Sequence, residues 1–206
     1  MNKKTQVIIV GGGPVGVGLA VDLGLRGVRS ILVEKRPDMH RVPRGQNLTQ
    51  RTLERFFFWG CVDELRAQRL LPPEVPAAGV TSYKSLTSEY WHAFEGREVV
   101  GEYYFQKNDR MPQYLLEGVL RRKMATLPQV EPMFGWTAQI ISQDEAGVCV
   151  EVRHNGSGET CVLDGEYVVG CDGGHSVVRE QAGVKRTGSG LRSAHGSRCI
   201  PLARTQ

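Results

Sequence analysis

Residues 6–18 decide the fold, and they read Gln-Val-Ile-Ile-Val-Gly-Gly-Gly-Pro-Val-Gly-Val-Gly. The four consecutive β-branched residues predict a short strand over Gln6–Val10 that is buried on both faces. The pattern Gly11-x-Gly13-x-x-Gly16 follows it directly. Pro14 suits the first turn of a helix, because the N–H that proline lacks would have no helical partner there. We therefore expect strand, glycine turn and helix in succession, as at the start of a Rossmann-type βαβ unit.

Each glycine of this pattern has its own role. The first permits the tight turn, the second lets the backbone approach a pyrophosphate, and the third lets the helix pack closely on the strand. The helix predicted over Val15–Arg26 would direct its N-terminus at the phosphates. Glu34 lies 18 residues past Gly16, at the end of a strand predicted over Ser30–Val33. An acid at this place binds ribose hydroxyls, so the unit predicts dinucleotide binding; the alternative is a glycine turn without a ligand.

The identity of the nucleotide is narrowed by charge. The Glu34 carboxylate would repel a 2′-phosphate, which favours FAD or NAD over NADP. Lys35 and Arg36 follow it and weaken that exclusion. The residues expected to bind the cofactor in this unit are Gly11, Gly13, Pro14, Val15, Gly16, Glu34, Lys35 and Arg36.

The formal charge of +4 does not indicate a nucleic-acid partner. All 22 acidic residues lie within positions 1–180, whereas five of the 26 basic residues lie beyond them. A basic tail on a near-neutral body is not the distribution of a protein that binds in a groove of nucleic acid.

The five cysteines form no Cys-x-x-Cys pair and have no histidine pair at metal-ligand spacing, so we expect reduced, structural thiols and no metal. No segment is apolar enough to span a bilayer, and we expect a cytoplasmic protein without a membrane partner.

The rest of the chain continues an α/β pattern. A Pro-rich break over 72–78 precedes an alternating aromatic stretch, Tyr83–Phe105, which predicts antiparallel sheet in a separate layer. Gly and Asn-Gly turns separate three later strands into a meander. The predicted helices are Leu48–Trp59, Pro112–Thr126 and Val177–Ala182, and the predicted strands are Phe134–Ser142, Val148–His154, Thr160–Leu163 and Tyr167–Gly170.

A second motif, about 155 residues after the first, begins where the last predicted strand ends. It reads Asp172-Gly173-Gly174-His175-Ser176-Val177-Val178-Arg179. It resembles the Asp-Gly, Ser and Arg signature of class A flavoprotein monooxygenases, the p-hydroxybenzoate hydroxylase-like family. The resemblance runs from Lys4 to about Arg186, and the order of elements agrees: βαβ unit, Arg-rich loop, aromatic layer, helix with a glutamine at its start, meander, Asp-Gly. It implies FAD as the cofactor.

The resemblance also implies roles for single residues. Arg44, in Pro43-Arg44-Gly45, matches the arginine near the FAD pyrophosphate, and Asp172, followed by Gly173, matches the aspartate that supports this region and Arg44. Gln113 matches the glutamine that hydrogen-bonds the FAD chain. Arg179 matches an arginine linked to nicotinamide-cofactor handling. As alternatives, each of Arg44, Gln113 and Arg179 is an ordinary surface residue, and His175 is expected to be solvated rather than catalytic.

The activity implied is hydroxylation of a phenolic or other aromatic substrate with NAD(P)H and O₂. No side chain is identified as a catalytic acid or base, so the catalytic residues are unknown. The aromatic residues of Tyr83–Phe105 either line a substrate pocket or only pack within their sheet. The expected partners are a small aromatic substrate and O₂, with a homo-oligomer as an open possibility.

The predicted fold class is α/β: a Rossmann-type FAD-binding domain with a parallel sheet and a β-meander, plus part of an antiparallel sheet on the substrate side. The expected division is 1–74 for the βαβ unit and Arg-rich loop, 75–109 for the aromatic layer, 110–186 for the second part of the FAD-binding domain, and 187–206 for an atypical tail.

Family members carry a further Gly-Asp motif, and no Gly-Asp dipeptide occurs here. We therefore expect a chain truncated at its C-terminus that does not hydroxylate a substrate by itself. The alternatives are an inactive FAD- or nucleotide-binding fragment and another FAD-dependent oxidoreductase with the same N-terminal unit.

Overall fold

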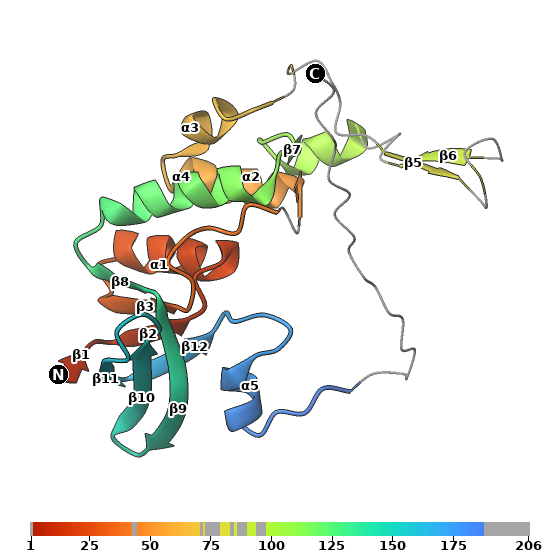
Figure 1. Ribbon diagram of the computed structural model, residues 1–206. Helices are drawn as coiled ribbons and strands as arrows, with labels where there is room; N and C mark the ends of the chain where they lie inside the picture. Colours follow the sequence, from red (N-terminus) through yellow and green to blue (C-terminus); the bar gives the residue numbers. More distant parts are fainter. Residues whose placement is uncertain are drawn as a thin grey trace, which may run out of the picture.

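The computed structural model describes residues 2–42, 45–70, 72, 79–82, 85, 90–93 and 98–187. Two sheets lie against each other in this part of the chain, and helices cover the outer face of the first (Figure 1). The first sheet is entirely parallel, with strand order β12-β2-β3-β8. Its members are β2 (Val7–Val10), β3 (Ser30–Glu34), β8 (Val130–Phe134) and β12 (Tyr167–Gly170).

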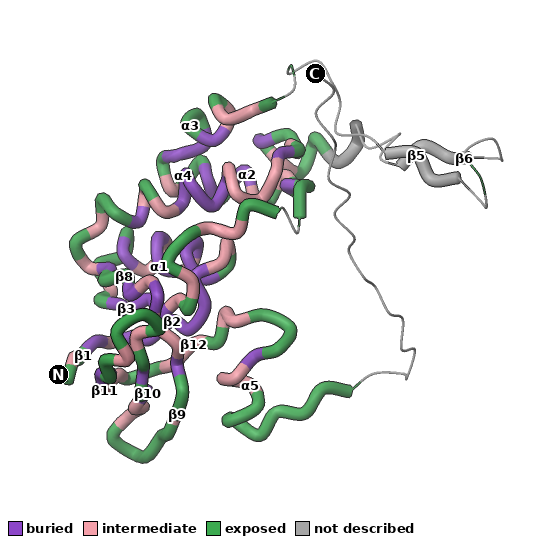
Figure 2. The backbone as a smooth tube through the Cα atoms, viewed as in Figure 1, coloured by how far each residue is buried: buried purple, intermediate pink, exposed green. Residues whose placement is uncertain are grey.

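Alternate side chains of β2 point into two different cores. Val7 and Ile9 pack toward the helices, whereas Ile8 and Val10 pack toward the second sheet. This two-sided burial is the reason why the strand is an uninterrupted β-branched run rather than an alternating one. The buried residues of β2 and β3 therefore lie at the centre of the molecule (Figure 2).

Helices α1 (Pro14–Leu25) and α4 (Gln113–Ala125) cover the helical face of the parallel sheet. Val17 and Val21 of α1 and Leu120 of α4 are fully buried in the core that they share with Ile9. Beyond them lie α2 (Gln50–Phe58) and α3 (Val62–Arg66), which contribute Leu53, Phe56 and Leu65 to the same core.

The second sheet has the order β1-β11-β10-β9 and packs on the opposite face. Strands β9 (Trp136–Asp144), β10 (Gly147–His154) and β11 (Thr160–Gly165) form an antiparallel meander, and β1 (Asn2–Lys4) pairs with β11 in parallel. Val150, Val152 and Leu163 face Ile8 across the interface. After β12, helix α5 (Val177–Gln181) packs against β9 and β12.

The predicted α/β class, parallel sheet and meander are confirmed, and most of the predicted element boundaries agree within two residues. Strand β8 is a difference: the sequence placed the start of the meander at Phe134, but Phe134 ends a fourth parallel strand that pairs with β3. Gly135, at φ +80°, turns the chain into β9. β8 contains Glu131 and Pro132 and lacks the apolar run of the other parallel strands, so its pairing with β3 was not visible in its composition.

The aromatic stretch is only partly a sheet. β6 (Tyr90–Ala93) pairs antiparallel with β5 (Gly79–Ser82), as predicted, but Glu98–Tyr103 forms a 3₁₀ helix. The prediction of a sheet is therefore wrong for this end of Tyr83–Phe105. The chain is held by α2 instead: the Phe105 N–H donates to Glu54 Oε1 (3.3 Å), and the Phe105 ring lies 5.0 Å from that of Phe57.

Two further short strands pair with each other, and the first of them leads into α2. β4 (Asn47–Leu48) pairs with β7 (Asp109–Arg110), and Thr49 caps α2 by accepting a hydrogen bond from the Thr52 N–H (3.3 Å). Helix α2 therefore begins at Gln50, two residues after its predicted start.

The predicted tail, 187–206, lies outside the described residues except for its first member. None of the helices in the described part is long and apolar enough to cross a membrane.

Candidate cofactor-binding site

A cleft of about 440 Å³ opens at the carboxyl ends of β2, β3 and β12, where ligands bind in open parallel sheets. Nine of the predicted site residues line it: Gly11, Gly13, Pro14, Glu34, Lys35, Arg36, Gln113, Asp172 and Gly173. Two predicted residues do not. Val15 is 72% exposed but is not among the lining residues, and Gly16 is buried against the Gly11 carbonyl group. Arg44 lies outside the described residues, so its predicted proximity to Asp172 stays a prediction.

The glycine turn is fixed by close backbone contacts. Gly11 has φ +108°, and a Cβ there would lie 2.4 Å from the Cys171 carbonyl oxygen at the end of β12. A Cβ at Gly16 would lie 1.8 Å from the Gly11 carbonyl oxygen. These two glycines therefore serve the tight turn and the close packing of α1 that the pattern predicts.

Gly13 differs from both of its partners in the pattern. It is the N-cap of α1 with extended backbone (φ −75°, ψ −176°), and a Cβ added to it would meet no atom of the described structure within 4 Å. The absence of a side chain at Gly13 leaves open space at the N-terminus of a twelve-residue helix. Backbone N–H groups and the helix dipole favour an anion at such a place.

Glu34 joins the end of β3 to the glycine turn. Its Oε2 accepts a hydrogen bond from the Gly12 N–H (2.6 Å), and its Oε1 accepts one from the Arg36 N–H (2.9 Å). A Cβ at Gly12 would lie 2.6 Å from the Glu34 Cβ, so Gly12 is required for this approach. The sequence pattern did not single out Gly12, although its place between Gly11 and Gly13 in a glycine triplet was the available signal. The carboxylate retains lone pairs for ribose hydroxyls.

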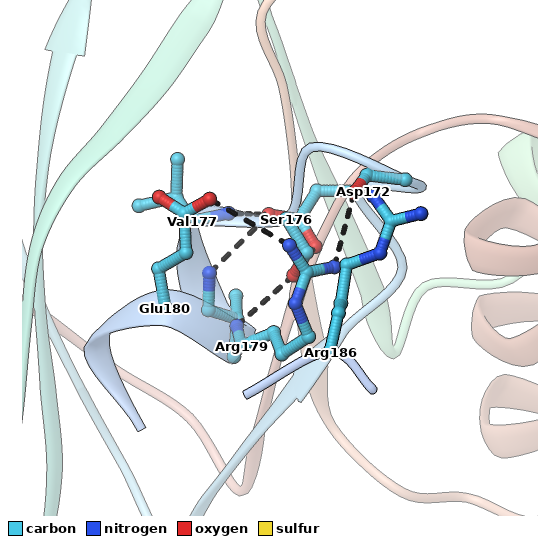
Figure 3. A network of polar contacts seen from close by, with 8 residues as sticks. Asp172, Ser176, Val177, Arg179, Glu180 and Arg186 are labelled. Atoms are coloured by element: carbon cyan, nitrogen blue, oxygen red, sulfur yellow. Dashed lines mark hydrogen bonds and ion pairs between the residues drawn. The ribbon is translucent and has the colours of Figure 1, made fainter. Parts of the chain in front are cut away.

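Asp172, which lines the cleft, accepts hydrogen bonds from residues at the start of α5 (Figure 3). Its Oδ1 accepts a hydrogen bond from Ser176 Oγ (2.5 Å), and its Oδ2 accepts from the Val177 N–H (2.6 Å) and the Val178 N–H (3.3 Å). Ser176 Oγ accepts in turn from the Arg179 N–H (3.0 Å). Asp172 and Ser176 therefore satisfy the N-terminal N–H groups of α5, while Gly173, at φ +84°, turns the chain past the cleft.

Two arginines, one at the end of this motif and one after it, share one backbone acceptor. Arg179 and Arg186 each donate through Nη1 to the Gly174 carbonyl oxygen, at 3.1 and 3.2 Å (Figure 3). Arg179 also lies 3.6 Å from Glu180 Oε1. His175 lines the cleft and is exposed, as expected of a solvated residue.

Helix α4 adds an ion pair that the sequence did not single out. Gln113, the first residue of α4, and then Glu117 and Arg121 face the cleft at successive turns of the helix. Arg121 Nη2 donates to Glu117 Oε1 (2.9 Å), and its guanidinium lies 4.3 Å from the Phe134 ring centre. Burial raises the pKa of Glu117, and the charge and hydrogen bond of Arg121 oppose that rise. The spacing of four residues from Gln113 to Glu117 to Arg121 was the signal available in the sequence.

The start of β9 also lines the cleft, through Trp136, Thr137 and Ala138. The Asn155 side-chain amide donates to the Lys35 carbonyl oxygen (2.6 Å), so the turn after β10 holds the chain that leaves Glu34. No group of three potential metal-ligating His, Cys, Asp or Glu side chains occurs among the described residues.

Comparisons with known proteins find relatives that match about nine-tenths of this chain. The chain is 32% identical over 187 residues to 3-(3-hydroxy-phenyl)propionate/3-hydroxycinnamic acid hydroxylase from Burkholderia cenocepacia, covering 91% of this chain and 33% of that protein. It is 33% identical over 191 residues to the Mycolicibacterium smegmatis enzyme of the same name, covering 89% and 31%. The chain thus spans about a third of the length of these relatives.

The solved structures place the same domain within larger flavoproteins. The flavin-dependent monooxygenase PieE, in complex with FAD and substrate, superposes with a TM-score of 0.78 at 30% identity, covering 87% of this chain and 32% of PieE. Aklavinone-11 hydroxylase with FAD and aklavinone gives a TM-score of 0.74 at 27% identity, covering 89% and 36%. Residues 4–197 match the family described as FAD binding domain. The chain therefore belongs to this FAD-binding family, whose relatives here are class A flavin monooxygenases and aromatic hydroxylases.

Proposed function

We propose that the chain binds FAD with its ADP half in the cleft between the glycine turn, Glu34 and Asp172. The observation that carries this proposal is the open space at Gly13, which faces the N-terminus of α1 and lies beside a carboxylate held by the Gly12 N–H. In this arrangement the pyrophosphate lies against Gly13 and Pro14, and the ribose hydroxyls donate to Glu34. Gln113 and Gly173 line the path of the chain that leads away from the pyrophosphate.

The residues of the cleft fit this cofactor in charge as well as in shape. The helix N-terminus and the N–H groups of the turn favour the phosphates, and Lys35 and Arg36 lie at the same cleft. Arg44 is proposed to offset the remaining phosphate charge, as the family resemblance implies. The Glu34 carboxylate lines the same cleft and accepts hydrogen bonds from the Gly12 and Arg36 N–H groups.

The reaction proposed for the complete active site is hydroxylation of an aromatic substrate with NAD(P)H and O₂. Bound FAD would supply the redox chemistry. The residues of this chain bind and orient the cofactor, and Arg179 is proposed to handle the nicotinamide nucleotide. The hydroxylase names of the relatives support this reaction class. The other candidate is a chain that binds FAD without hydroxylating a substrate.

A titration followed by an activity assay separates these possibilities. Purified protein is titrated with FAD by calorimetry, and then assayed for NADH and NADPH oxidation with a panel of phenols and product analysis. Saturable FAD binding together with a hydroxylated product supports the whole proposal. FAD binding without product supports cofactor binding alone, and absence of FAD binding contradicts the proposal.

A further inference from the structure

We propose that the indole ring of Trp136 is the platform on which the adenine of the bound nucleotide stacks. This inference rests on the proposed FAD site and names the residue that recognises its base. It starts from the direction of the cleft. The glycine turn takes the phosphates and Glu34 takes the ribose, so the base must lie at the part of the cleft beyond Glu34.

Strand pairing places Trp136 at that part of the cleft. Glu34 of β3 is the register partner of Phe134 at the end of β8, and Trp136 follows two residues later, after the Gly135 turn. Trp136, the first residue of β9, is therefore close in sequence to the register partner of Glu34, and it lines the cleft with Lys35 and Arg36. Among the described residues that line the cleft, Trp136 has the largest aromatic ring; the others are the imidazoles of His40 and His175.

The Trp136 ring contacts its register partner on the neighbouring strand β10. The imidazole of His154 lies 5.2 Å from the Trp136 ring centre at an interplanar angle of 56°. His154 is itself fixed, because its Nδ1 accepts a hydrogen bond from the Ser157 N–H (3.0 Å) and lies 2.9 Å from Ser157 Oγ.

Two glycines leave the space that His154 needs. A Cβ at Gly135 or at Gly156 would lie 3.3 Å from the imidazole. Trp136 is half-buried and packs against His154, which restricts the motion of the indole and lowers the entropic cost of stacking a base on it. Stacking of a base on an aromatic ring contributes substantially to binding, because every base presents a π-face.

The test compares ligands that contain adenine with one that does not. Calorimetry with ADP and with inorganic pyrophosphate is performed on the full chain and on Trp136→Ala and Trp136→Phe. Loss of a stacking ring weakens base binding by on the order of tenfold. We expect this loss for ADP in Trp136→Ala, near-normal ADP binding in Trp136→Phe, and unchanged pyrophosphate binding in both.

Fluorescence gives a second readout that does not depend on the alanine variant being stable. ADP should quench the emission of the wild-type protein and of Trp59→Phe and Trp91→Phe, but not that of Trp136→Phe. Wild-type ADP affinity in Trp136→Ala, or persistent quenching in Trp136→Phe, would overturn the assignment of Trp136 while leaving the FAD site in place. A wild-type protein that binds neither FAD nor ADP would overturn the proposed function and this inference together.

Discussion

The carboxylate of Glu34 accepts a hydrogen bond of 2.6 Å from the backbone N–H of Gly12. This contact ties the end of β3 to the turn that follows β2, so the predicted ribose ligand and the predicted phosphate turn form one unit. The unit depends on Gly12 lacking a side chain, because a Cβ there would lie 2.6 Å from the Glu34 Cβ. A change at Glu34 should therefore affect the nucleotide directly and the turn indirectly.

Glu34→Ala should weaken FAD and ADP binding roughly 10- to 100-fold, the expected cost of losing hydrogen bonds to a charged acceptor. Glu34→Gln keeps one acceptor oxygen and should lose less. Because the negative charge is gone, Glu34→Gln should also bind 2′,5′-ADP better relative to 5′-ADP than the wild-type protein does. Calorimetric titrations with the two nucleotides measure both effects.

Inorganic pyrophosphate is the control for this prediction. It lacks the ribose, so its affinity reports the turn alone. If Glu34→Ala weakens pyrophosphate and ADP by the same factor, Glu34 acts by shaping the turn and is not a ribose ligand.

Gly13→Val should abolish measurable FAD binding without harming the fold. The backbone of Gly13 is extended and its Cβ position is free, so a side chain is tolerated and would occupy the space proposed for the pyrophosphate. Because Gly13 is the N-cap of α1, where valine is disfavoured, the unfolding free energy should fall by about 1 kcal/mol. Unchanged FAD affinity in a well-folded Gly13→Val protein would remove the pyrophosphate from this position.

Gly16→Ala is the matched control within the same pattern. Its Cβ would lie 1.8 Å from the Gly11 carbonyl oxygen, so α1 must move away from β2. Overpacking of this kind costs about 1–3 kcal/mol of unfolding free energy. The two variants should thus separate a glycine that serves the ligand from one that serves the fold.

The sequence was sufficient for the parts of the fold that have a local signature. Short stretches of sequence predict these parts: the β-branched run before Gly11, the glycines of the turns and the alternating strands of the meander. Strand β8 does not, since it contains Glu131 and Pro132 and is a strand because β3 lies beside it. The 3₁₀ helix over Glu98–Tyr103 was missed for a similar reason, because the contacts of Phe105 with Glu54 and Phe57 are tertiary.

The residues of the cleft likewise divide into those that the sequence predicted and those that it did not. Motif spacing predicted six of the residues that line the cavity, namely Gly11, Gly13, Pro14, Glu34, Lys35 and Arg36. The family resemblance supplied the other three, Gln113, Asp172 and Gly173. Glu117 and Arg121 were not predicted, although their spacing from Gln113 was a signal in the sequence. Trp136 was not predicted because only packing brings the start of β9 to the same opening as Glu34. The exposed Val15 shows the reverse error, because membership of the motif did not make it a lining residue.

Asp172→Ala should loosen α5 and the loop that forms one wall of the cleft. The substitution removes the acceptor of three hydrogen bonds, from Ser176 Oγ and from the Val177 and Val178 N–H groups. Unsatisfied donors of this kind cost about 1–3 kcal/mol each if they are shielded from water. Amide hydrogen exchange should therefore accelerate at Val177 and Val178, with Asp172→Asn intermediate. Unchanged protection at these two amides would contradict the capping role of Asp172.

The last prediction concerns Glu117 and pH. Burial raises the pKa of this carboxyl in the folded protein, although Arg121 acts against it. A carboxyl group whose pKa is higher in the folded than in the unfolded state lowers the free energy of unfolding when it is ionised. Its unfavourable contribution is absent at a pH below the unfolded pKa and grows as the pH rises through the folded pKa.

Glu117→Gln removes this titration and retains a side-chain oxygen that can accept from Arg121. The unfolding free energy of Glu117→Gln minus that of the wild-type protein should therefore be larger at pH 7 than at pH 4. Urea denaturation of both proteins at the two pH values measures this difference. The control is Glu131→Gln, which removes an exposed carboxylate of β8 that is also paired, in this case with Lys3. A difference that shrinks between pH 4 and pH 7 would show that the ion pair with Arg121 outweighs the burial of Glu117.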